Sequence, residues 1–179
     1  SGIRGNCIYL ESNTVKIIID SGLSVKELGR RLKSIDRTPE ELDAVFLTHE
    51  HSDHIHGVGP LLRKYSIPLY ATKGTIQAGL KLGIIPVFNP IRAGEIIQLG
   101  GLEIEPYATS HDAEESVAYV VSFQNRKLGH ATDMGVITHE NRDKLKDSHV
   151  LLLESNHDIE MLNAGPYPWA LKQRIKSEL

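Results

Sequence analysis

The chain has 179 residues, 40% hydrophobic residues and a formal net charge of −3. This length and composition suit one globular domain with a substantial core, and we expect a single domain over residues 1–179 that is truncated at both ends. No apolar run is long enough to span a membrane, and a chain whose only cysteine is Cys7 forms no internal disulfide, which favours a cytoplasmic location. The acidic balance argues against broad coating of the surface by nucleic acid.

Strand and helix signals alternate through the first half of the chain. Residues 7–11 alternate in polarity like a strand, and the capping box Ser24-Val25-Lys26-Glu27 marks the start of a helix. The further elements that we predict up to residue 82 are strands over 15–20, 44–48 and 67–71 and helices over 60–65 and 75–82.

Paired strands dominate the second half, where Gly-Gly and Gln-Asn turns predict two hairpins. The predicted elements are paired strands over 95–99 and 102–105, paired strands over 117–123 and 126–131, a helix over 138–145, a buried strand over 149–154, and a helix over 168–176 anchored by Trp169. This order of elements predicts an α/β fold of four layers, in which two mixed sheets face each other with helices outside.

A run rich in metal-ligand residues follows the apolar stretch 44–47. Residues 48–54 read Thr-His-Glu-His-Ser-Asp-His. Because strand residues two apart point the same way, we expect His49 and His51 to share one face, where both can bind one ion. Asp53 and His54 follow where the chain turns, within reach of a second ion. Imidazole and carboxylate suit zinc, iron or manganese, whereas a histidine-rich surface loop is the alternative.

The pattern His-x-His-x-Asp-His resembles the signature of the metallo-β-lactamase-fold hydrolases. The later ligand positions of that family match His111, in Thr-Ser-His-Asp, and Asp133, in Ala-Thr-Asp-Met-Gly. The segments 151–158 and 165–169, Leu-Leu-Leu-Glu-Ser-Asn-His-Asp and Gly-Pro-Tyr-Pro-Trp, are similar to the bacterial YycJ/WalJ group of exonucleases. The resemblance implies the αββα sandwich, a four-layer arrangement that agrees with the order of elements.

The resemblance also implies a dinuclear site that holds two divalent ions, zinc or manganese. Its implied ligands are His49, His51 and His111 on the first ion, Asp53 and His54 on the second, and Asp133 as the bridge. Members of the family usually carry one more ligand histidine near the C-terminus. No histidine follows His157, and the second site is therefore expected to be incomplete in this sequence.

Other polar residues are candidates for roles around the metals. We assign catalytic roles to Asp53 and to His157, which is either a proton donor or phosphate contact or else a hydrogen-bonded loop residue. The family has an aspartate at the position of Asp20 that hydrogen-bonds the metal-binding loop, although a plain turn residue is the alternative. Glu154 either binds a backbone amide at the rim of the site or simply ends a strand.

The expected function is hydrolysis of a phosphodiester by a metal-bridging hydroxide, with a DNA exonuclease as the leading hypothesis. The partner is then nucleic acid or a small phosphodiester, with no membrane involved, and the oligomeric state stays open. An acyl hydrolase that acts on thioesters or lactams, or an inactive metal-binding fragment, are the alternatives. A diiron oxygen reductase of this fold is disfavoured, because those members place a glutamate at the position of His51 and need a flavin domain.

Overall fold

The computed structural model describes residues 5–79, 82–154, 159–169 and 172–173. Within these residues the strands form two five-stranded sheets. The first sheet has the order β1-β2-β3-β4-β5, with bounds β1 Ile8–Glu11, β2 Lys16–Ile19, β3 Ala44–Phe46, β4 Leu69–Ala71 and β5 Phe88–Pro90. The second has the order β10-β9-β8-β7-β6, with bounds β6 Ile97–Leu99, β7 Leu102–Ala108, β8 Val117–Phe123, β9 Arg126–Ala131 and β10 Val150–Leu153.

Both sheets are mixed. In the first sheet β1 and β2 are antiparallel and the remaining pairs are parallel. In the second sheet β10 is parallel to β9 and the other pairs are antiparallel. The helical elements are α1 Val25–Lys33, η1 Pro39–Glu41, α2 Ser52–Ile55, α3 Val58–Tyr65, α4 Lys73–Ala78, α5 His139–Leu145 and α6 Ile159–Ala164. The predicted fold, two mixed sheets flanked by helices, is confirmed.

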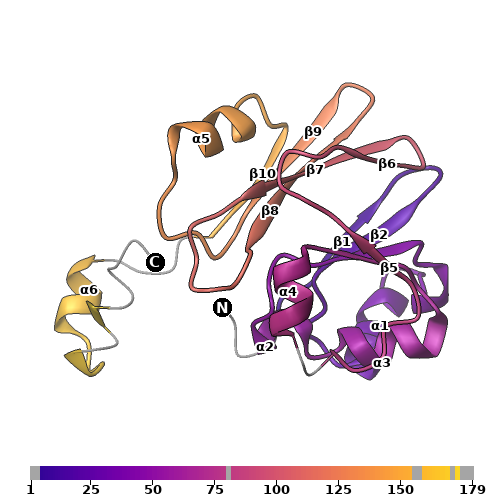
Figure 1. The fold of residues 1–179 in the computed structure, drawn as a ribbon, viewed down its shortest axis with the longest axis horizontal. Coiled ribbons are helices and arrows are strands. Elements are labelled where there is room, and N and C mark those ends of the chain that lie inside the picture. The colour runs from indigo at the N-terminus through magenta and orange to yellow at the C-terminus, as the bar shows by residue number, and fades with distance from the viewer. Residues whose placement is uncertain (1–4, 80–81, 155–158, 170–171, 174–179) are drawn as a thin grey trace.

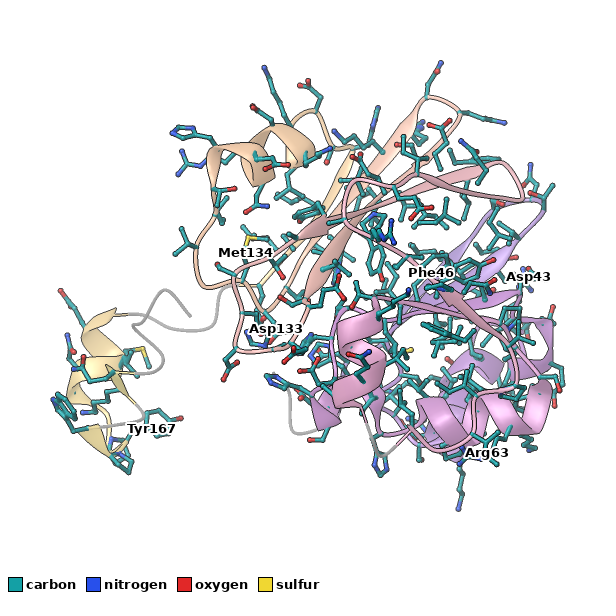
Figure 2. The ribbon with its side chains drawn as sticks, in the orientation of Figure 1. Asp43, Phe46, Arg63, Asp133, Met134 and Tyr167 are labelled. Atoms are coloured by element: carbon teal, nitrogen blue, oxygen red, sulfur yellow. The ribbon has the colours of Figure 1, made fainter. Side chains whose placement is uncertain are left out.

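The layers follow from the alternation of side chains along the buried strands. Figure 1 shows α1 and α3 on one side of the first sheet, the second sheet on its other side, and α5 beyond the second sheet. Ile18 packs with the helices, whereas its neighbours Ile17 and Ile19 pack in the core between the sheets. Phe46 lies in that central core, stacked on Tyr70 with ring centroids 4.6 Å apart (Figure 2).

The predicted strand over 44–48 ends early, at Phe46. The amide of Thr48 donates to the side-chain oxygen Oδ1 of Asp20 at 2.9 Å and no longer to a neighbouring strand. His49 and His51 therefore lie in a connecting loop, and strand alternation does not explain how they come together. The side-chain bond to Asp20 ends the ladder and turns the backbone toward α2.

Two predictions about the C-terminal part were wrong. The strand expected to be buried over 149–154 is β10, the last strand at one edge of its sheet. Its residues Val150, Leu151 and Leu153 are about half exposed. Trp169 is 76% exposed, so it is not buried as an anchor among the described residues. β5 and α6 were not predicted, and most of the predicted helix over 168–176 lies outside the described residues. In Figure 1, α6 lies apart from the two sheets.

Candidate metal centre

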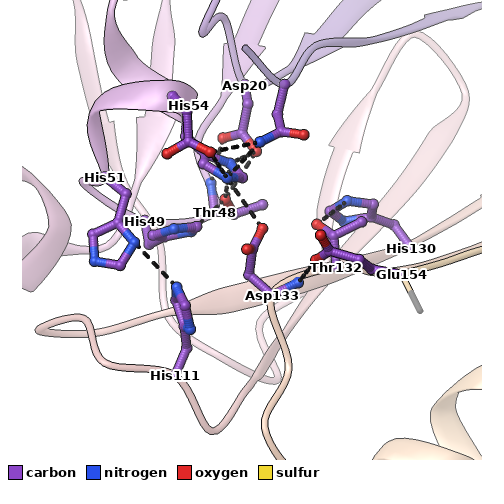
Figure 3. Close-up of polar contacts among 12 residues, drawn as sticks. Asp20, Thr48, His49, His51, His54, His111, His130, Thr132, Asp133 and Glu154 are labelled. Atoms are coloured by element: carbon purple, nitrogen blue, oxygen red, sulfur yellow. Dashed lines mark hydrogen bonds and ion pairs between the residues drawn. The ribbon is translucent and has the colours of Figure 1, made fainter. Parts of the chain in front are cut away.

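Three connections between elements, together with the short helix α2, bring the candidate ligands to one edge of the two sheets (Figure 3). The loop between β3 and α2 carries His49 and His51, and α2 itself carries Asp53 and His54. The other two come from the second sheet. His111 follows β7, and Asp133 follows β9, which is why residues more than 80 positions apart meet at one place.

The candidate ligands form two compact groups. His49, His51 and His111 make one group, and His49, His54 and Asp133 make the other. In each group the potential ligand atoms all lie within 4.8 Å of one another. Because His49 belongs to both groups, the two places where an ion could bind are adjacent. These are the only such groups of three or more among the residues that the structure describes.

Asp20 and Thr48 hold the two buried histidines from behind. The Nδ1 atom of His54 lies 2.8 Å from Oδ2 of Asp20, and Nδ1 of His49 lies 2.9 Å from Oγ1 of Thr48. Thr48 in turn donates from its hydroxyl to Asp20 at 2.8 Å. The prediction that Asp20 hydrogen-bonds the histidine-rich loop is therefore confirmed. Both rings present their Nε2 atoms to the centre of the site.

Asp112 holds the two more exposed histidines in the same manner. Its backbone oxygen lies 3.1 Å from Nε2 of His51, and its carboxylate lies 3.4 Å from Nδ1 of His111. The remaining ring nitrogens, Nδ1 of His51 and Nε2 of His111, face each other at 3.2 Å (Figure 3). Each of the four histidines thus has one nitrogen held by the residues behind it, as in metal-binding histidines.

The donor atoms fit a divalent ion. Nε2 of His49 is buried and has no hydrogen-bond partner among the described residues, which is costly unless a ligand binds there. Nε2 of His54 lies 3.0 Å from Oδ2 of Asp133. Imidazole nitrogens that converge with a carboxylate are the ligand set of zinc and related transition metals.

The protonation of the two groups differs. Burial lowers the pKa of His49 to about 2, aided by the neighbouring imidazoles, and burial also lowers the pKa of His111. Burial acts the same way on His54, but the carboxylates of Asp133 and Asp20 raise its pKa to about 10. Although burial opposes it, the bond to His54 holds the pKa of Asp133 below its usual range. In the metal-free protein His54 is therefore a cation at neutral pH, whereas His49 is neutral.

Asp53 lies beside the second group but outside it. Its Oδ2 atom is 3.7 Å from Nε2 of His54 and accepts a hydrogen bond from the side-chain amide of Asn6 at 3.2 Å. The same amide nitrogen is 2.8 Å from Nε2 of His54. Asn6 thus bridges the two residues that were expected to share an ion. His157, the other expected catalytic residue, lies outside the described residues.

Asp133 is held by the predicted rim residue Glu154. The backbone amide of Asp133 donates to Oε2 of Glu154 at 2.7 Å, which confirms the expected amide contact. Asp133 has a φ of +51°, a left-handed conformation that non-glycine residues rarely adopt. The contact therefore fixes an unusual backbone turn that points the carboxylate toward His54.

Some supporting residues were missed from the sequence. Glu50 accepts a hydrogen bond from the amide of Glu114 at 2.9 Å, and Glu115 accepts one from the amide of Gly74 at 2.7 Å. These contacts tie the loop that carries His111 to the histidine-rich loop and to the start of α4. The only clue in the sequence to the role of Glu50 was its position between two histidines, because its partner Glu114 is 64 residues away.

Comparison with known proteins identifies the family. Residues 16–173 match the family profile described as Beta-lactamase superfamily domain. The chain is 38% identical to exodeoxyribonuclease YycJ of Bacillus anthracis and 40% identical to exodeoxyribonuclease WalJ of Streptococcus pneumoniae serotype 2. Both alignments cover the whole chain and 69% and 68% of the relatives, respectively. The chain therefore spans about two thirds of their length.

Solved structures agree on the fold. Zinc-bound PqqB from Methylobacterium extorquens superposes with a TM-score of 0.73 at 15% identity, over 92% of this chain and 65% of that one. The metallo-beta-lactamase fold protein YhfI from Bacillus subtilis gives a TM-score of 0.60 at 22% identity, over 71% and 54%. Among the described residues, no helix is long and apolar enough to cross a bilayer. The chain belongs to the beta-lactamase superfamily and to its YycJ/WalJ group, which confirms the expected metallo-β-lactamase-fold hydrolase.

Proposed function

We propose that this chain is a dinuclear metal-dependent phosphodiester hydrolase that degrades DNA as an exonuclease. The observation that carries the proposal is the pair of ligand groups that share His49, because two adjacent ion sites suit in-line attack on a phosphodiester. The relatives that align with the whole chain are named exodeoxyribonucleases, and their names support DNA as the substrate class.

The ligand roles combine the two groups with the family resemblance, which adds Asp53 to the second ion and makes Asp133 the shared residue. His49, His51 and His111 would hold the first ion, and His54 and Asp53 the second, with Asp133 shared between the two. Zinc or manganese fits these donors. The carboxylate of Asp133 would offset the repulsion between the two cations. When bound, two such ions supply a hydroxide at neutral pH, because metal binding lowers the pKa of water from about 15.7 to about 7.

The protein's own residues orient and tune this centre. Asp20 keeps a hydrogen of His54 on Nδ1, so that Nε2 is the nitrogen that can lose its proton and bind an ion. Asp53 lies at the outer side of the second group with 30% of its side chain exposed, where it can orient the attacking water and accept its proton. The buried environment of His49 strengthens the interaction between the site and the negative charge of a phosphodiester.

A substrate panel tests the proposal. The protein is stripped with a chelator, reloaded with zinc or manganese, and assayed with single-stranded DNA, bis(p-nitrophenyl) phosphate and a thioester. We expect hydrolysis of both phosphodiesters, mononucleotide products from DNA, and no activity in the stripped protein. Turnover of the thioester alone would instead identify an acyl hydrolase. Metal bound at two equivalents without any turnover would identify an inactive metal-binding protein. The cytoplasmic location stays a prediction, to be checked by cell fractionation.

A further inference from the structure

A polar cavity adjoins the candidate metal centre on the side of Asp53. It has a volume of about 690 Å³ and lies between α1, α2 and the turn at Gly5. Asp53 lines it together with the hydroxyl residues Ser24 and Ser52. A ligand in this cavity would therefore reach the second ligand group from outside.

Two arginines of α1 form the basic wall of the cavity. Arg30 and Arg31 both line it, as does Glu27, one turn earlier on the same helix. Glu27 accepts hydrogen bonds from Nε and Nη2 of Arg30 at 2.9 and 2.7 Å and from Nε of Arg31 at 2.9 Å. One carboxylate thus pairs with two guanidinium groups beside the cavity, whose side chains are 70% exposed for Arg30 and 47% exposed for Arg31.

The charge and donors of this trio match one phosphodiester. Two guanidinium groups and one carboxylate carry a net charge of about +1, and a phosphodiester carries about −1. Each guanidinium has five N–H donors. The three bonds to Glu27 therefore leave most of the donors of Arg30 and Arg31 available. Arginine binds phosphate oxygens through two parallel N–H groups, a geometry that a lysine cannot supply.

Arg31 acts electrostatically on Cys7, the residue that follows Asn6. Burial and the charge of Asp20 raise the pKa of the Cys7 thiol, and the charge of Arg31 opposes them. His56, at the end of α2, lines the same cavity. The chain as a whole has a net charge of −3, and a polyanionic strand therefore needs a local cationic site to bind next to the metals.

We propose that this cavity binds a backbone phosphate of the DNA strand adjacent to the phosphodiester that is cut. The inference rests on the proposed function, since the strand must run from the metal centre past Asp53 to reach Arg30 and Arg31. Arg30 and Arg31 would then bind DNA and position the strand relative to the metal centre, without taking part in the chemical step.

The test compares three variants of the 179-residue chain. Arg30→Ala/Arg31→Ala removes the proposed phosphate contact. Lys33→Ala removes one charge from the same helix outside the cavity and serves as the matched control. Glu27→Gln keeps the size of the side chain and makes the trio more positive. Binding of a fluorescent single-stranded oligothymidine is measured by anisotropy at several salt concentrations, and hydrolysis of this oligonucleotide and of bis(p-nitrophenyl) phosphate is measured in parallel.

We expect the double variant to bind DNA about tenfold more weakly, with a salt slope reduced by about 0.7 for one lost phosphate contact. Its ratio of DNA to bis(p-nitrophenyl) phosphate activity should fall about tenfold through KM. Glu27→Gln should shift DNA affinity in the opposite direction, which a damaged fold cannot do. Lys33→Ala should match the wild type.

Other outcomes separate the inference from the function on which it rests. If the wild type hydrolyses both phosphodiesters while the double variant and Lys33→Ala bind DNA alike, the inference is wrong and the proposed function stands. If the metal-loaded wild type hydrolyses neither phosphodiester, the proposed function fails, and the inference fails with it.

Discussion

Replacing Asp20 with asparagine tests whether the protein sets the tautomer of His54. Asp20 is buried and accepts three hydrogen bonds, from the amide of Thr48 at 2.9 Å, the hydroxyl of Thr48 at 2.8 Å, and Nδ1 of His54 at 2.8 Å. Its φ of +61° is left-handed, a conformation that asparagine tolerates as well as aspartate does. The substitution therefore changes hydrogen bonding and charge while it leaves the backbone turn in place.

In Asp20→Asn, the side-chain oxygen has to stay with the Thr48 amide, because two facing donors repel. The new NH₂ group then points at Nδ1 of His54, which has to become an acceptor. The hydrogen of the neutral ring moves to Nε2, the nitrogen that would bind the second ion. Loss of such a supporting carboxylate typically weakens metal binding by about 10- to 100-fold, or about 1.4–2.7 kcal/mol.

The affinities of the two ions are measured by calorimetric titration of zinc into the stripped protein. We expect Asp20→Asn to weaken binding of the second ion by the factor above and to weaken binding of the first ion less. Two of the first ion's ligands, His51 and His111, do not contact Asp20, and His49 is linked to it only through Thr48. Asp43→Asn is the matched control, because Asp43 also accepts a backbone amide, that of Lys16, but far from the site. If Asp20→Asn bound both zinc ions with wild-type affinity, this account of the His54 tautomer would be refuted.

The remaining predictions concern the ligands and pH. His51→Ala should lose the first ion, measured by elemental analysis, and its activity should fall more than 100-fold. His139→Ala, at an exposed histidine, should keep the metal content and the activity of the wild type. Asp133→Asn should weaken both ions at least about tenfold on titration while circular dichroism stays unchanged, because the shared negative charge is lost. Because its pKa is raised to about 10, His54 must lose a proton to bind an ion. Below pH about 10, affinity for the second ion should rise about tenfold per pH unit, with about one proton released, as calorimetry in two buffers would detect. In the metal-free protein the stabilisation by the charged His54 should be complete below its unfolded pKa of 6.5 and be lost as pH rises through about 10, which thermal melts would follow.

The sequence predicted the elements best where local patterns determine them. Residues 117–123 and 126–131 form strands with the predicted bounds, since alternation and a two-residue turn are local signals. The strand before the histidine-rich run was predicted two residues too long, because its end depends on a side-chain bond from Asp20, 28 positions earlier. The exposure of β10 likewise depends on which strand lies at the sheet edge, and a run of leucines alone predicts burial.

The site shows the same division. The spacing and the family resemblance predicted which histidines and aspartates would gather, and the structure brings His49, His51, His54, His111 and Asp133 together. What the sequence did not predict is how each ring is held. The contacts of His51 with the backbone oxygen of Asp112 and of Glu50 with the amide of Glu114 join segments 61 and 64 residues apart. Such contacts leave no local pattern.

Two strained aspartates show that the site has shaped the fold. Asp20 and Asp133 both follow a strand and both have positive φ angles, of 61° and 51°. A left-handed turn costs an ordinary residue roughly 1–2 kcal/mol, and glycine would avoid that cost. Glycine, however, has no carboxylate to hold His54 on either side of its ring. The bonds from Thr48 to Asp20 and from Asp133 to Glu154 offset the strain, and the fold thus keeps a carboxylate on each side of one imidazole.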